Sequence, residues 1–173
     1  MQKWKKNNTN PGTLQKRPGH FLKMFLRFPV FLHQIGIGGW EQLLGMQWMF
    51  ITTIGRKTGK QCYAMVDVID YDKERDIYYI EVAYGQRADW FQNIQANPIF
   101  HAQVGKRQFK ASATMLSAEQ AGNAIVAFAN RHPHYSRTVM AMVGIKFDDD
   151  DELRLMAREW IFLAVQPENN NNG

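Results

Sequence analysis

The sequence predicts an α+β protein built around a small, mainly antiparallel β-barrel with peripheral helices. Short segments rich in β-branched and aromatic residues recur between residues 48 and 115, separated by glycine-containing or charged turns. Helical periodicity appears only after residue 117, and a last apolar segment near the C-terminus can close the sheet. A chain of 173 residues suits one such domain with a proper core.

A hairpin over residues 48–70 is the stretch around which the rest is arranged. Its flanks are typical of strands, and the turn between them supplies two glycines and three cations: Gly55, Arg56, Lys57, Thr58, Gly59 and Lys60. Glycine allows the left-handed backbone of a tight turn. The cations cannot all point inward, so the turn is a candidate phosphate or carboxylate site, with Arg56 offering a bidentate fork. The alternative is a solvated hairpin tip.

Beyond the hairpin we expect a series of short elements in this order: strand 77–83, loop 84–88, helix 90–96, strand 99–104 and strand 107–115. Asp89 precedes the helix and is a suitable N-cap, while Asn97-Pro98 ends it. Gly105-Lys106 provides the turn of a second hairpin.

The last third of the chain is mostly helical. Ser117 is a good cap for a helix that runs to about Arg131. The sequence His-Pro-His-Tyr at 132–135 is typical of a loop. Two short helical stretches then follow, at 136–143 and 151–158, with an acidic run between them. A closing strand is expected at 160–165.

The basic character of the chain lies in its N-terminal arm. The net charge is +5, yet residues 1–40 hold seven cations and no acid, which leaves 14 cations against 16 acids elsewhere. This distribution argues against a nucleic-acid site on the folded body. We expect a flexible basic arm at 1–19, a single domain at 20–167 and a disordered tail at 168–173.

Residues 20–40 predict an amphipathic helix that Pro29 kinks or divides. Its longest uncharged run, residues 28–40, is too short to span a bilayer. Either this helix caps the core, or residues 1–40 make a peripheral contact with anionic membrane. The single cysteine, Cys62, indicates a reducing compartment, so we expect a cytoplasmic protein. If residues 1–40 contact the membrane, we expect the protein to lie at its inner face.

Side chains for conventional catalysis are missing from the sequence. No group of His, Cys and carboxylate residues has metal-ligand spacing, and His132 and His134 flank a proline without partners nearby in the sequence. Neither GxSxG nor GxGxxG occurs. We therefore expect no metal site, and an enzyme of this kind must take its chemistry from a cofactor.

Two motifs in order give the chain a family resemblance. Residues 51–60 read Ile-Thr-Thr-Ile-Gly-Arg-Lys-Thr-Gly-Lys, and residues 89–98 read Asp-Trp-Phe-Gln-Asn-Ile-Gln-Ala-Asn-Pro. Together they resemble the deazaflavin-dependent nitroreductase family, whose split β-barrel fold is shared with flavin-dependent pyridoxamine-phosphate-oxidase-like proteins. The resemblance covers about residues 40–116 and returns weakly at 133–135 and in the last strand.

The resemblance implies binding of reduced coenzyme F420, whose phosphate and oligoglutamate tail are anionic. The expected phosphate and tail contacts are Arg56, Lys57 and Thr58. The residues expected along the deazaflavin ring and ribityl chain, offering backbone N–H groups, are Ala83, Tyr84, Gly85, Gln86 and Arg87. Trp90 would wall the ring unless it is a plain core aromatic, and Asn93 would fasten the short helix to the barrel. Met65 would face the same pocket.

The implied reaction is hydride transfer from F420 to an electron-poor, lipophilic acceptor such as a quinone, a nitroaromatic or an activated alkene. Tyr135 is the candidate substrate-side hydroxyl.

The chain departs from the family at two places. Gln61-Cys62 replaces the Pro-Arg that often follows the turn, and the loop at 84–88 lacks a lysine, for which Arg87 is the substitute.

Other functions fit the same barrel. One is an FMN- or FAD-dependent reductase, and another is a non-catalytic protein that carries a cofactor or tetrapyrrole. A nucleic-acid or membrane-binding module depends only on the basic arm. Barrels of this type are often dimers, so a homodimer is a further expectation, although no residue pattern marks an interface.

Overall fold

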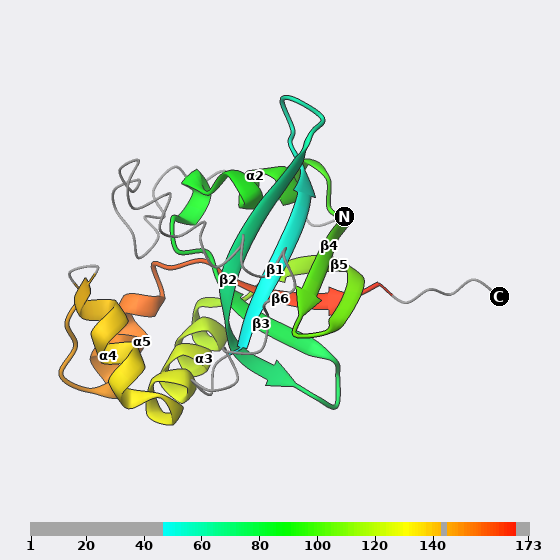
Figure 1. The fold of residues 1–173 in the computed structure, drawn as a ribbon. Helices are drawn as coiled ribbons and strands as arrows, with labels where there is room; N and C mark the ends of the chain where they lie inside the picture. Colours follow the sequence, from blue (N-terminus) through cyan, green and yellow to red (C-terminus); the bar gives the residue numbers. More distant parts are fainter. Residues whose placement is uncertain (1–46, 143–144, 169–173) are drawn as a thin grey trace.

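Six antiparallel strands form a closed barrel in the computed structural model, which describes residues 47–142 and 145–168 (Figure 1). Around the barrel the strands follow the order β1-β2-β3-β6-β5-β4. Their bounds are β1 Gln47–Ile54, β2 Gln61–Asp72, β3 Ile77–Glu81, β4 Phe100–Val104, β5 Arg107–Met115 and β6 Phe162–Pro167. The predicted α+β fold, a mainly antiparallel barrel with peripheral helices, is confirmed. The predicted basic arm and N-terminal helix lie outside the described residues.

The helices are short and lie outside the sheet. Their bounds are the 3-10 helix η2 Gly85–Arg87, α2 Asp89–Ala96, α3 Ala118–Arg131, α4 Pro133–Met142 and α5 Asp150–Ala157. In Figure 1, α2 crosses the barrel near the tip of the β1–β2 hairpin, whereas α3, α4 and α5 gather beside its other end. Among the described residues, no helix combines the length and apolar character needed to cross a membrane.

Alternate residues of the strands fill the barrel interior. Met49 and Ile51 of β1 are buried, and they lie opposite Val66 and Ala64 of β2 in the same core cluster. Helix α2 adds Phe91 to this cluster, and its side chain is fully buried. Because neighbouring side chains of a strand point to opposite faces, the intervening residues of β1 and β2 lie on the outside of the barrel.

A bulge gives β2 a part in two separate cores. Val68 pairs with Ile80 and Asp70 pairs with Tyr79, so Ile69 is an extra residue in β2. Ile69 is buried in a second apolar cluster, which α3, α4 and α5 form against the outside of the sheet. Beyond the bulge, Tyr71 packs against the barrel core again.

The first half of β2 has a strand neighbour on one side only. β1 pairs with Gln61–Val68, whereas β3 pairs with β2 from Val68 to Asp72. Within the described part of the chain, the edge of residues 61–67 opposite β1 therefore has no paired strand. This unpaired edge lies between the cationic hairpin and the bulge.

Two predicted details are wrong. Asp89 is not the N-cap of α2; that position is Ala88, and Asp89 lies in the first turn. Residues 132–135 are not a loop, because α4 already begins at Pro133. Proline favours the first helical position, where its fixed φ fits and no N–H is needed. Ser117, as predicted, caps α3, and it forms a capping box with Gln120.

Two leucines of α5 test the second core. Leu153 is fully buried, whereas Leu155 is 61% exposed. Leu153→Ala should lower the free energy of unfolding by about 2–5 kcal/mol because it leaves a cavity, while Leu155→Ala should change it by less than about 0.5 kcal/mol. Chemical denaturation of both variants measures the difference. Equal losses would contradict a core beneath α5.

Candidate functional site

The cationic turn is shaped by its own backbone. The Gly55 N–H donates to the Lys60 carbonyl at 2.7 Å, and the Gly59 N–H donates to the Gly55 carbonyl at 2.8 Å. Gly59 has a positive φ of 67°. A Cβ on Gly55 would lie 2.8 Å from the Thr58 hydroxyl oxygen and 3.2 Å from the Lys60 carbonyl, so only glycine fits this position without a shift.

Two lysines of the turn point to solvent. Lys57, Thr58 and Lys60 are exposed. Among the described residues, no ion pair joins either lysine to a carboxylate, and the Thr58 hydroxyl oxygen accepts the Lys60 N–H at 3.3 Å. Two ammonium groups and a hydroxyl on a fixed turn form a donor set that fits a phosphate or carboxylate group.

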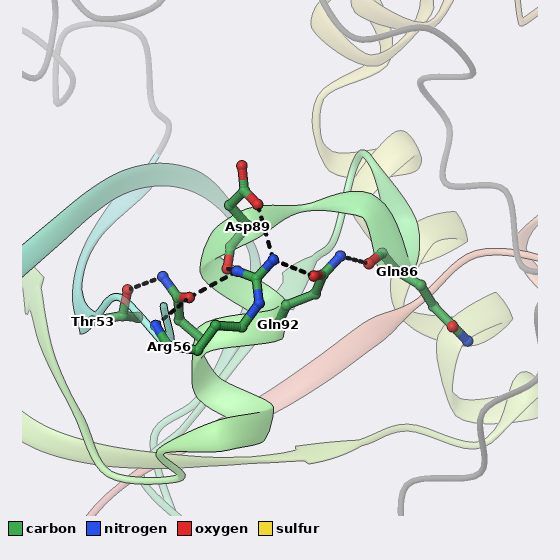
Figure 2. Close-up of polar contacts among 6 residues, drawn as sticks. Thr53, Arg56, Gln86, Asp89 and Gln92 are labelled. Carbon is green, nitrogen blue, oxygen red and sulfur yellow. Dashed lines mark hydrogen bonds and ion pairs between the residues drawn. The ribbon is translucent and has the colours of Figure 1, made fainter. Parts of the chain in front are cut away.

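Arg56 differs from the lysines because its guanidinium is bound within the protein. Figure 2 shows it lying against α2, whose Asp89 and Gln92 side-chain oxygens both accept from its Nη2. Its Nη1 donates to the Asn93 Oδ1 at 2.9 Å and to the Asp89 carbonyl at 3.4 Å. The structure therefore separates Arg56 from Lys57 and Thr58, with which the sequence grouped it.

The same network reaches the barrel and the loop before α2. The Asn93 side chain, which is buried, donates to the Thr53 hydroxyl of β1 at 3.2 Å, so Asn93 fastens α2 to the barrel as the resemblance implies. Gln92 donates to the Gln86 carbonyl at 2.6 Å (Figure 2). A continuous chain of hydrogen bonds thus links the cationic turn to η2. The sequence motif contained these residues, but it did not show that they share one network.

The loop expected along the cofactor ring is compact. The Gly85 N–H donates to the Val82 carbonyl, and the Arg87 N–H donates to the Tyr84 carbonyl, so these two N–H groups are used inside the loop. Tyr84 packs against the barrel core, and burial raises the pKa of its hydroxyl. Ala83 and Gln86 are partly buried and Arg87 is exposed.

The two other expected ring contacts lie in different surroundings. Trp90 is partly buried and packs against the barrel core, with its ring edge-to-face against Phe91 at 6.2 Å between centroids. Met65 pairs with Phe50 on the outer face of the β1–β2 hairpin, where it is partly buried.

Tyr135 and Asp67 meet across the outer face of β2. Tyr135 lies in the first turn of α4, and its hydroxyl donates to the Asp67 Oδ2 at 3.2 Å. Trp48 is opposite Asp67 in the β1–β2 register and gives the carboxylate a second hydrogen bond. The Tyr135 ring also packs edge-on against Phe128 of α3. The sequence singled out Tyr135 but gave no sign of its partners.

Burial shifts the titration of both groups. It raises the pKa of the Asp67 carboxyl above its usual value, and the hydrogen bonds from Tyr135 and Trp48 only partly oppose the rise. Burial and the adjacent carboxylate likewise raise the pKa of the Tyr135 hydroxyl, which keeps the phenol protonated.

Comparison with known proteins identifies related sequences and folds. The sequence profile of the F420H2-dependent quinone reductase family matches residues 33–144, more than half of the chain, and this range holds the cationic turn, α2 and Tyr135. No curated protein matches the chain. Two solved structures are similar at 18% identity and a TM-score of 0.46.

The first of these is an F420-H2 dependent reductase (FDR-A), of which 93% is covered, and the second is described as a domain-swapped dimer, of which 79% is covered. Each alignment spans 69% of this chain. Similarity at this level says nothing about what this chain binds or how it assembles.

Replacing Arg56 tests the network. Arg56→Ala removes the charged guanidinium donor from the buried Asn93 side chain, although the backbone N–H of residue 56 still donates to it. The guanidinium bonds to Asp89 and Gln92 are lost as well, so the free energy of unfolding should fall by about 1.5–3 kcal/mol. Lys57→Ala, at an exposed neighbour in the same turn, should change it by less than about 0.5 kcal/mol. Chemical denaturation compares the two. If both variants lost the same stability, Arg56 would not be the residue that holds the turn.

Asp67 should make stability depend on pH. Its folded pKa lies above its unfolded value near 3.8, so the wild type should lose stability as pH rises from about 4 through the folded pKa. Asp67→Asn cannot ionise, and between pH 4 and 8 it should gain at least about 1 kcal/mol relative to wild type. Urea denaturation across this range measures the gain, with exposed Asp148→Asn as the control. Parallel curves for wild type and Asp67→Asn would contradict the raised pKa.

Proposed function

This chain belongs to the family of F420H2-dependent quinone reductases, and from that premise we propose that it transfers a hydride from reduced coenzyme F420 to a quinone. As a member of the family, the protein is an oxidoreductase that uses coenzyme F420. When bound, the reduced deazaflavin supplies the hydride, and the protein supplies position and electrostatics. The observation that carries the site assignment is the hydrogen-bonded turn with two exposed lysines, neither of which forms an ion pair with another described residue.

We assign the anionic part of the cofactor to this turn. Lys57 and Lys60 are charged and exposed, and Thr58 adds a hydroxyl between them. Their backbone is fixed by Gly55 and Gly59, so little conformational entropy is lost when an anion binds. Arg56 was expected to contact the phosphate directly. Because its Nη1 and Nη2 atoms already bind α2, we propose instead that it holds the turn in place behind the lysines.

The ring is assigned to the unpaired edge of β2 and the neighbouring η2. The first half of β2 lacks a second strand neighbour among the described residues, and the network from Arg56 to Gln92 and Gln86 fixes η2 relative to the turn. This arrangement supports the expectation that residues 83–87 follow the ring and the ribityl chain. Trp90 at the same end of the barrel then limits access of water to the ring.

The acceptor is proposed to approach from the side of α4. Tyr135 presents a protonated hydroxyl there, and Met65 and Phe50 give the neighbouring outer face an apolar character that suits a lipophilic quinone. The hydroxyl proton is directed to Asp67 in the structure; if it turned to a quinone oxygen, the hydrogen bond would strengthen as negative charge developed on that oxygen. The family assignment favours a quinone over a nitroaromatic or an activated alkene.

A fluorescence titration tests the anion site. The double variant Lys57→Ala/Lys60→Ala should bind F420 about 10- to 100-fold more weakly than wild type, because two charge-assisted contacts are lost. Lys106→Ala is the matched control, since Lys106 is an exposed lysine in the β4–β5 turn, and its affinity should equal that of wild type.

The same experiment separates the alternatives. Wild type should bind F420 in preference to FMN and reduce a soluble quinone when given reduced F420. Preferential binding of FMN would overturn the cofactor assignment, and F420 binding that Lys106→Ala weakens as much as the double variant does would overturn the site. Reduction of nitroaromatics without quinones would overturn the acceptor.

A further inference from the structure

A carboxyl group with two neutral hydrogen-bond donors lies beside the proposed acceptor site. Asp67 is partly buried on the outer face of β2, two residues along from Met65. Tyr135 of α4 and Trp48 of the neighbouring strand β1 donate hydrogen bonds to it. Neither donor carries a charge, so in the part of the chain that the structure describes the carboxyl has hydrogen bonds without charge compensation.

The charged groups nearby are directed elsewhere. Arg131 of α3 reaches β2 only at the Ile69 carbonyl and the Asp70 carboxylate. His132, which ends α3, packs its ring against Phe128 at 5.2 Å between centroids. Within residues 47–142 and 145–168, no ion pair includes Asp67.

An isolated carboxylate in such surroundings is unfavourable, because desolvation is not repaid by an opposite charge. A protonated carboxyl avoids that penalty and keeps both contacts, with its own O–H donating to the Tyr135 oxygen in place of the reverse hydrogen bond, which frees the Tyr135 proton for the acceptor. We propose that Asp67 holds a proton at neutral pH and delivers it, through the Tyr135 hydroxyl, to the oxygen of the acceptor as it is reduced. This inference rests on the proposed function and adds a proton source to it.

The atoms and electrons of the step balance. Reduction of a quinone to a hydroquinone requires one hydride and one proton. The hydride of the family's reaction brings both electrons and leaves a negative charge on a quinone oxygen. The Tyr135 O–H bond breaks and its proton passes to this oxygen, while the Asp67 O–H bond breaks and its proton restores the Tyr135 hydroxyl. The Asp67 carboxylate then takes a proton from water.

The relay explains why the phenol alone is not sufficient. Burial raises the pKa of Tyr135, so a phenolate left after proton donation would be a high-energy product. A carboxyl whose pKa is raised by burial is a better-matched acid than the phenol for a reaction near pH 7. Asp67 lies 3.2 Å from the Tyr135 hydroxyl, which is hydrogen-bonding distance, so the phenol need not remain ionised.

Carbon-13 NMR of the protein labelled at the aspartate carboxyl carbons tests the proton directly, without cofactor or acceptor. The signal lost in Asp67→Asn belongs to Asp67, and exposed Asp148→Asn identifies a reference carboxylate. We expect the Asp67 signal at pH 7 to be that of a protonated carboxyl, distinct from the reference signal of exposed Asp148. Titration of both signals together at acidic pH would overturn the proposal.

Kinetics then test delivery of the proton. With reduced F420 and a soluble quinone, Asp67→Asn should lower kcat about 100-fold with KM within about twofold of wild type. Tyr135→Phe should do the same, and the double variant should be no slower than either, since the two residues act in one path. Wild-type kcat should fall as pH rises through the Asp67 pKa measured by NMR. The kcat of Asp67→Asn should not show this fall, whereas that of Asp67→Glu should.

The outcomes distinguish the two proposals. If wild type reduces the quinone and Asp67→Asn does so equally fast, the proton relay is wrong and the proposed function stands. If wild type binds reduced F420 but reduces no quinone, the proposed function is wrong and proton delivery is wrong with it, whatever the NMR shows. Asp67→Asn should also bind F420 as tightly as wild type; weaker binding would indicate a structural role and overturn the relay.

Discussion

The bond between the Arg56 guanidinium and the Asn93 side chain is the contact on which the geometry of the site depends. A guanidinium offers donors in a rigid plane, and here they meet a side-chain amide, two further side-chain oxygens and a carbonyl of one short helix. Asn93 is buried, so the loss of its partners would leave polar atoms unsatisfied in the core. Arg56 holds the turn against α2, and the exposed lysines Lys57 and Lys60 are the cations of the turn that face solvent and can bind a ligand.

The second feature of the site is the use of both faces of β2. Its inner face completes the barrel core with Ala64 and Val66, and its outer face carries Met65 and Asp67, of which Asp67 accepts a hydrogen bond from Tyr135 of α4. Helices α3 and α5 anchor α4 through a core of their own. The position of Tyr135 over the strand is therefore fixed by packing that does not involve the barrel interior. A change in the barrel core need not displace Tyr135, and a change in the core of α3, α4 and α5 need not displace the cationic turn.

Much of the fold could be predicted because its signals are local. Strand segments, the glycine-containing turn and the Ser117 cap each depend on a few neighbouring residues. Asp89 was misjudged because its carboxylate binds Arg56, a residue 33 positions away, and local preference says nothing of such a partner. The same reasoning missed the start of α4, where Pro133 has the role of first helical residue rather than helix breaker.

The candidate site was predictable only where one motif contained it. Lys57, Thr58 and Lys60 could be grouped because they share a turn, and the structure exposes all three. The pair formed by Asp67 and Tyr135 spans 68 positions and could not be predicted, because no periodicity connects a strand residue to the first turn of a distant helix.

The bulge at Ile69 has a consequence for how the length of this chain can vary. Before the bulge, alternate residues such as Ala64 and Val66 face the interior, and beyond it the phase is reversed at Tyr71. Deleting Ile69 would leave Val68 and Tyr71 facing the interior in a regular strand, but it would remove the side chain that β2 contributes to the second core. Related chains should therefore keep this segment at constant length and accept insertions at tips such as Gly105, so gaps in an alignment can separate relatives that keep the site from those that have lost it.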